Sequence, residues 1–165
     1  MSFVAEDGTG KSDANSFVSL ADADAYHADR RSAAAWDALD DDDEKKPYMI
    51  EATTWINSLD FENGSPISDT QALFFPAYGA YDRNGFMIDS DVVPQQVKDA
   101  TAELAYRIRD TEVEADQERQ KNRVKMGPME VGYDPYSTLQ KQYPFVLRIL
   151  KGLIRDSGCG ELVRG

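Results

Sequence analysis

The segment that sets the architecture reads PQQVKDATAELAYRI, from Pro94 to Ile108. Proline is tolerated in the first turn of a helix, where a backbone N–H has no intrahelical acceptor. Apolar and small residues then recur at the spacing of one helix face, and they are Val97, Thr101, Leu104, Ala105 and Ile108. The pattern predicts an amphipathic helix over about residues 94–118, which is polar on all sides beyond Arg109.

Two longer helical segments and a short one are expected before it. Ser19 stands where a capping residue would begin an alanine-rich helix over Leu20–Arg31. A short turn of helix is expected around Ala34–Leu39. The acidic run Asp40–Glu44 suits the first turn of another helix, because carboxylates there face the positive end of the helix dipole. An apolar stripe extends that helix to about Leu59.

Glycine and proline mark the other segments. Asn84-Gly85 lies between two short strand-like runs and predicts a two-residue hairpin turn of type I′. A second hairpin is expected over Arg123–Tyr133, turning at Gly127-Pro128. A final apolar helix follows Pro144, and Gly152 within it is expected to weaken it by about 1 kcal/mol relative to alanine.

Together these segments predict one mainly α-helical domain over residues 1–165. It is expected to be a small bundle of about four helices with one or two β-hairpins. The hydrophobic content of 41% is enough for a single core. Residues 1–18 are predicted to form an extended arm or an edge strand, residues 19–156 the helical core with its hairpins, and residues 157–165 a glycine-hinged tail.

Charge limits the possible partners. Thirty acidic residues against 18 basic ones give a net charge of −12. A protein that grips nucleic acid through phosphates needs clustered lysine and arginine, so this chain is expected on average to repel a polyanion. Cys159 is the only cysteine, which excludes an intrachain disulfide and a cysteine-based zinc site. We find neither a secretory signal nor a membrane-spanning apolar run, and expect a soluble protein made in a reducing cytoplasm.

Two motifs resemble functional loops without completing them. The segment AEDGTGKS (residues 5–12) nearly matches a P-loop, but Ala5 replaces the first glycine, and Glu6 and Asp7 would face the phosphates. Residues 82–85 echo part of a calcium loop but lack flanking amphipathic helices. The single histidine, His27, is expected on a helix surface. We therefore expect no catalysis, no cofactor and no metal.

A modest basic cluster keeps a second function open. Arg119, Lys121, Arg123 and Lys125 precede several tyrosines, and base stacking on aromatic side chains is how single strands are held. Acidic residues lie directly before this cluster, so a solvated helix end is the default interpretation. Single-stranded DNA binding is therefore the alternative function.

Short motifs in a fixed order run through nearly the whole chain. They are EDGTG (6–10), ANSF (14–17), ADAY (23–26) with Trp36, QALFFP (71–76), Tyr81-Asp82 with Gly85, Pro94 with VKDATAEL (97–104), GPMEV (127–131) and LVRG (162–165). With this set the chain resembles the phage protein family often labelled putative DnaT-like single-stranded DNA-binding protein. Its members look like head-to-tail adaptors (head–tail connector proteins) of tailed phages. The FFP segment departs from the Trp-Pro expected there, a conservative aromatic change.

The resemblance implies a structural, non-enzymatic virion protein. Such adaptors look like small helical bundles arranged in a ring, usually twelve-fold, beneath the portal. The implied partners are further copies of the chain, the portal protein, a downstream tail or stopper protein, and double-stranded DNA that passes through the lumen without sequence-specific binding. The resemblance places the protein in the virion neck and, during assembly, in the host cytoplasm, with no membrane contact.

A ring requires two different faces on each subunit, because contacts related by rotation are heterologous. The segment 60–94 is expected to supply one face, through Phe74, Phe75, Tyr78, Tyr81, Phe86 and Met87. The adaptor resemblance further implies a portal-docking tail made of Gly158, Cys159, Gly160, Glu161, Leu162, Val163 and Arg164. Leu162 and Val163 would be its anchors, and Arg164 would pair with an acid. The alternative is a DnaT-like replication protein that binds single-stranded DNA.

Overall fold

The computed structural model describes residues 2–39, 42–109, 123–126, 129–132 and 143–155. Within these ranges lie five helices: α1 (Leu20–Ala28), α2 (Ala33–Asp37), α3 (Asp42–Asn57), α4 (Gln95–Arg107) and α5 (Pro144–Ile149). Two antiparallel pairs accompany them, β1 (Ser65–Pro66) with β2 (Ala77–Tyr78), and β3 (Arg123–Met126) with β4 (Met129–Gly132). The predicted class, mainly α with small hairpins, is confirmed. No helix in the described ranges has the length and apolar character to cross a membrane.

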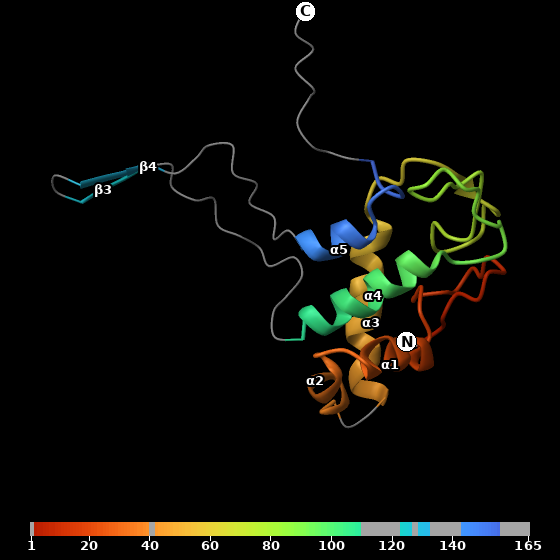
Figure 1. The fold of residues 1–165 in the computed structure, drawn as a ribbon, viewed down its shortest axis with the longest axis horizontal. Coiled ribbons are helices and arrows are strands. Elements are labelled where there is room, and N and C mark those ends of the chain that lie inside the picture. Colours follow the sequence, from red (N-terminus) through yellow and green to blue (C-terminus); the bar gives the residue numbers. More distant parts are fainter. Residues whose placement is uncertain (1, 40–41, 110–122, 127–128, 133–142, 156–165) are drawn as a thin grey trace, which may run out of the picture.

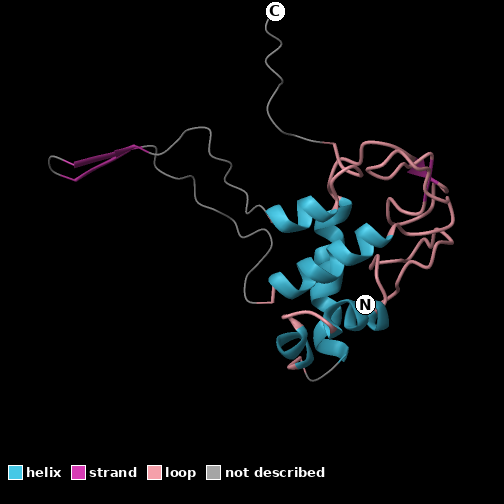
Figure 2. Ribbon diagram, viewed as in Figure 1, coloured by secondary structure: helices cyan, strands magenta, loops and turns pink. Residues whose placement is uncertain are grey.

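The core forms where α4 lies across α3, with α1 and α5 packed on α4 (Figure 1). Val97 and Leu104 of α4 are fully buried, as are Met49 and Ile56 of α3. The apolar face predicted for the helix after Pro94 is thus confirmed. The helices gather on one side, and the loops of residues 2–18 and 58–94 lie beside them (Figure 2).

The expected length of that helix is wrong. α4 ends at Arg107, and Ile108 caps it by donating its N–H to the carbonyl of Leu104. Ile108 and Arg109 form a turn. The predicted continuation over residues 110–118 lies outside the described residues.

The predicted start of α1, with Ser19 as its capping residue, is confirmed, but the helix is shorter than expected. Ser19 Oγ accepts the backbone N–H of Asp22 over 3.1 Å. The helix ends at Ala28 rather than at Arg31, because the N–H of Arg30 turns back to the carbonyl of His27. The guanidinium of Arg30 lies over the ring of Tyr26, at 3.6 Å from its centroid.

The expected extended arm over residues 1–18 is instead a loop closed on the body. The carbonyl of Val4 accepts the N–H groups of both Asn15 and Ser16, and the N–H of Glu6 donates to the carbonyl of Ser16. Phe17 and Val18 are buried in the core. Their burial holds the loop against the helices, an outcome that its polar composition does not reveal.

The turn at Asn84-Gly85 differs from the predicted type I′ hairpin. Asp82 and Phe86 are joined by a backbone hydrogen bond, so the loop holds three residues rather than two. Asp82 Oδ1 accepts the N–H groups of Asn84 and Phe86, at 2.8 and 2.9 Å. Gly85 takes a φ of +83°. The Asp82 side chain organises the turn, and the N–H of Phe86 is the main cause that lowers its pKa.

The last helix is shorter than expected, and Gly152 lies beyond it. α5 ends at Ile149, and Gly152 has a φ of +92°. A Cβ at this position would lie 2.5 Å from the Cβ of Arg83. Gly152 therefore permits a close contact between two loops. The expectation that this glycine weakens a helix is wrong, because residue 152 lies beyond the end of α5. The second hairpin is confirmed, with Val124 opposite Val131; its turn and residue 133 lie outside the described residues.

Candidate functional site

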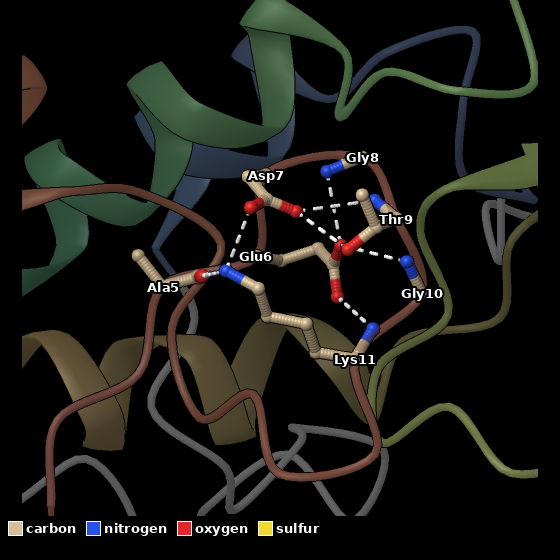
Figure 3. A network of polar contacts seen from close by, with 7 residues as sticks. All are labelled: Ala5, Glu6, Asp7, Gly8, Thr9, Gly10 and Lys11. Carbon is tan, nitrogen blue, oxygen red and sulfur yellow. Dashed lines mark hydrogen bonds and ion pairs between the residues drawn. The ribbon is translucent and has the colours of Figure 1, made fainter.

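The turn that resembles a P-loop is filled by the chain's own carboxylate (Figure 3). Glu6 is 4% exposed. Its Oε1 accepts the N–H groups of Gly8 and Gly10, both at 2.9 Å, and its Oε2 accepts that of Lys11 at 2.8 Å. Successive backbone N–H groups of this kind form an anion-binding concavity. Here the bound anion is Glu6, so the amides that would cradle a phosphate hold a structural role.

Two further features fix this turn. Gly8 has a φ of +102°, and a Cβ there would lie 1.8 Å from the carbonyl oxygen of Asp91. Lys11 Nζ lies 2.8 Å from Asp7 Oδ2 and donates to the carbonyl of Ala5 over 3.0 Å. Hydrogen bonds from Lys11 and then from Thr9 lower the pKa of Asp7 to about 2. The lysine thus serves the loop itself, unlike a P-loop lysine, which reaches a phosphate.

His27 is buried, whereas the sequence predicted it on a helix surface. Its ring is fully buried, with its centroid 4.6 Å from that of Trp36. Nε2 lies 3.1 Å from the carbonyl of Ala102, and Nδ1 lies 2.7 Å from Ser32 Oγ. A carbonyl only accepts hydrogen bonds, so Nε2 carries the proton. Burial lowers the pKa of His27, which favours the neutral ring.

A second polar connection joins α1 to α4. The hydroxyl of Tyr26 donates to Oε2 of Glu103 over 3.1 Å, and Nε of Arg107 donates to Oε1 of the same carboxylate over 2.7 Å. Burial, and then the charge of Glu103, raise the pKa of Tyr26 to about 12. Both carboxylate oxygens are therefore used inside the fold. This geometry is that of a structural contact between helices.

The six aromatic and apolar side chains expected at a subunit contact divide into two groups. Phe75 is 1% exposed, and Phe74 stacks on Phe61 with a centroid distance of 4.5 Å. Burial removes Phe75 from the expected contact set. Four side chains stand in solvent, and we call them the exposed apolar surface: Tyr78 (58% exposed), Tyr81 (44%), Phe86 (71%) and Met87 (68%). That they contact a neighbouring subunit stays a prediction.

The loop that carries the exposed apolar surface is held by two partly buried side-chain amides. Gln71 Nε2 donates to the carbonyls of Leu73, Phe74 and Pro76, at 2.6, 3.1 and 3.1 Å. Asn57 Oδ1, at the end of α3, accepts the N–H of Phe74 over 2.8 Å. The N–H of Ile88 donates to the carbonyl of Ala80. The surface is therefore presented on a backbone with many fixed points.

Two other expected sites receive no structural description. The predicted docking tail, residues 158–164, lies outside the described residues. Of the basic cluster, the structure describes only the backbone of Arg123 and Lys125, which belong to β3. In the ranges that are described, no group of three or more His, Cys, Asp or Glu side chains is arranged to hold a metal ion.

Fold and surface define a small, acidic, mainly α-helical protein that presents apolar side chains on a fixed loop. The chain belongs to the family described as Putative DnaT-like ssDNA binding protein, whose model matches residues 1–165. A search of curated proteins and a search of solved structures both give no match.

Proposed function

We propose that the chain is a structural, non-enzymatic virion protein of a tailed phage, which forms the head-to-tail adaptor ring beneath the portal. The observation that carries this proposal is the exposed apolar surface on a fixed loop of a chain with net charge −12. Contiguous apolar surface in solvent is typical of protein–protein contacts, and Tyr81 and Met87 lie opposite each other in one bridge of this loop. A strongly acidic surface opposes adhesion of a polyanion and lets DNA pass.

The ion pairs strengthen the case against a general phosphate-binding surface. Within the described residues, five cations are paired with the chain's own carboxylates, and they are Lys11, Lys45, Lys46, Lys98 and Arg107. Lys45 is the most buried of them and lies 2.9 Å from Asp24 Oδ1. A cation already paired in this way has less to gain from a phosphate.

The proposed partners follow from the ring. Each subunit would contact two further copies, the portal protein and a downstream tail or stopper protein, in a twelve-fold assembly at the virion neck. Double-stranded DNA would pass through the lumen without sequence-specific contacts. Tyr81 and Met87, opposite each other in an antiparallel bridge, would lie at a subunit contact.

Single-stranded DNA binding is the second candidate, and the description of the family favours it. Exposed Tyr78, Tyr81 and Phe86 are side chains on which bases stack. Such binding relies on phosphate contacts and weakens steeply as salt rises. This dependence separates the two functions.

The test measures both activities on the full chain. A fluorescent oligonucleotide is titrated at low and moderate salt, and the chain is separately sedimented with portal particles of the same phage. We expect co-sedimentation with the portal and no oligonucleotide binding at moderate salt. Salt-sensitive binding to the oligonucleotide, together with no co-sedimentation, would establish the second candidate instead.

The proposed docking tail has its own test. A chain ending at residue 157 lacks Leu162 and Val163, the two proposed anchors. We expect this shortened chain to keep its fold and to lose co-sedimentation with the portal. Unchanged docking would remove the tail from the proposal.

A further inference from the structure

A basic groove opens between the end of α3 and α5. Its volume is about 510 Å³, and Leu59, Leu147 and Ile154 contribute apolar lining. Arg148 and Lys151 are exposed at the same groove. The combination of apolar lining and positive charge is unusual in a chain of net charge −12.

Backbone hydrogen bonds fix the two sides of this groove to each other. The N–H of Arg155 donates to the carbonyl of Asp60 over 2.8 Å, and the N–H of Glu62 donates to the carbonyl of Leu153 over 2.8 Å. Phe61 and Ile154 form an antiparallel bridge between these contacts. The groove is therefore built into the fold by segments more than 80 residues apart in sequence.

The groove carries an excess of positive charge. Arg148, Lys151 and Arg155 line it with a single carboxylate, that of Asp60. None of the ion pairs between described residues uses any of these three cations. Unpaired cations beside apolar side chains favour an occupant that has both carboxylates and apolar atoms.

The opposite end of α3 offers that chemistry. Asp37, Asp43 and Glu44 are exposed there, and we call them the acidic end. Trp36 Nε1 and Lys45 Nζ share Asp24 Oδ1, at 2.7 and 2.9 Å, which holds α2 and the start of α3 together. The 16 residues of α3 span about 24 Å, so the acidic end and the groove lie at opposite ends of the helix (Figure 1).

We propose that the basic groove takes the acidic end of a neighbouring copy, an inference that rests on the proposed ring. Charge complementarity carries it, because the groove holds three cations outside the ion pairs given above, and the acidic end exposes Asp37 and Glu44 beside Asp43, which already pairs with Lys46. Two different patches at opposite ends of one subunit make a heterologous contact, which closes into a ring when the rotation allows. The exposed apolar surface then remains available for a second contact.

Chemical cross-linking tests this contact directly. A water-soluble carbodiimide joins an amine to a carboxylate that it touches, so it would link Lys151 to Asp43 or Glu44. Mixing unlabelled and nitrogen-isotope-labelled chains distinguishes links between copies from links within one chain. We expect mixed-isotope peptides that contain Lys151 and Glu44. Their absence would overturn the proposal, as would a link from Lys151 to Glu161 of the same chain, which would make the chain's own tail the occupant.

Charge exchange provides the second test. Lys151→Glu and Glu44→Lys should each weaken ring assembly roughly tenfold, and the two together should restore it because the pair is re-formed in reverse. Arg83→Glu is the matched control, since Arg83 is exposed and lies next to Gly152 without lining the groove. Equal thermal melting curves show that each variant folds.

The outcomes separate this inference from the proposed function. Rings that form on the portal and ignore Lys151→Glu would overturn the groove contact and leave the adaptor function standing. Oligonucleotide binding that Lys151→Glu abolishes, with no rings from the unmodified chain, would overturn both. Failure of the double variant to restore assembly would overturn the pairing of these two residues.

Discussion

His27 Nε2 lies 3.1 Å from the carbonyl oxygen of Ala102, and this contact ties α1 to α4 across 75 residues of sequence. The ring reaches Ser32 with its other nitrogen, so one side chain connects the end of α1, the start of α2 and the centre of α4. Because the ring is fully buried, its neutral form belongs to the folded state.

Stability is therefore expected to depend on pH through His27. The pKa of the folded ring lies below the ordinary value of about 6.5 that holds in the unfolded chain. Below that value the unfolded state binds more protons than the folded state, so the free energy of unfolding falls as pH falls. The slope from one proton is at most about 1.4 kcal/mol per pH unit. Above about pH 7 this contribution is constant.

The matched control is His27→Gln, whose amide N–H can donate to Ala102 but does not titrate. Urea unfolding, followed by fluorescence of Trp36 and Trp55, measures both proteins between about pH 7.5 and about pH 5.5. The unmodified chain should lose more stability over this range than the variant. Parallel curves for the two proteins would show that His27 is not the group responsible.

Replacement of Glu6 should destabilise the fold. In Glu6→Gln one oxygen becomes an NH₂ group, which cannot accept the N–H of Lys11 or of the glycines. A buried N–H without an acceptor costs about 1–3 kcal/mol, so the urea midpoint should fall clearly. Asp13→Asn in the same loop is the control: its side chain is exposed, and the midpoint should hardly move. Equal midpoints for both variants would contradict the structural role of Glu6.

Gly152→Ala tests whether residue 152 is helical. Were residue 152 helical, alanine would stabilise the chain by about 1 kcal/mol. The structure predicts destabilisation, because φ is +92° and the new Cβ would overlap the backbone of Arg83. Gly85→Ala is matched in φ, at +83°, but its Cβ would meet no atom within 4 Å. Thermal unfolding should therefore show a larger loss for Gly152→Ala than for Gly85→Ala.

The exposed apolar surface should matter for assembly and not for folding. Phe86→Ser with Met87→Ser removes two side chains that are about 70% exposed, so stability should change by no more than about 0.5 kcal/mol. Ring formation on the portal, scored by sedimentation, should be lost. Val92→Ser, at another exposed apolar position outside this surface, should assemble normally. Rings from the double variant would show that the surface has another use.

Local pattern was sufficient to predict where the helices begin, but not where α1, α4 and α5 end. The apolar spacing after Pro94, the Ser19 cap and the acidic start of α3 each depend on residues within one or two turns. The pairing of β3 with β4 likewise joins residues that are fewer than ten positions apart in sequence. For such elements the determining contacts are close in sequence.

The rest depends on contacts that sequence spacing does not encode. Burial of His27 requires Ala102, and burial of Phe17 and Val18 requires the closed N-terminal loop. Gly152 appeared to lie within a helix because its contact with Arg83 is visible only in the fold.

The candidate contact residues could likewise be predicted only in part. Four of the six expected contact side chains are exposed, whereas Phe75 went into the core with the residues around it. The groove could not be predicted, because Leu59 and Lys151 line one cavity only after the chain has folded.

We propose that copies of this chain recognise one another and the portal, while their carboxylates keep DNA from adhering. The most direct measurement is electron microscopy of the full chain mixed with portal particles of the same phage. We predict an additional closed ring of density on one side of the portal. Bare portal particles, with the chain instead coating an added oligonucleotide at moderate salt, would contradict the claim.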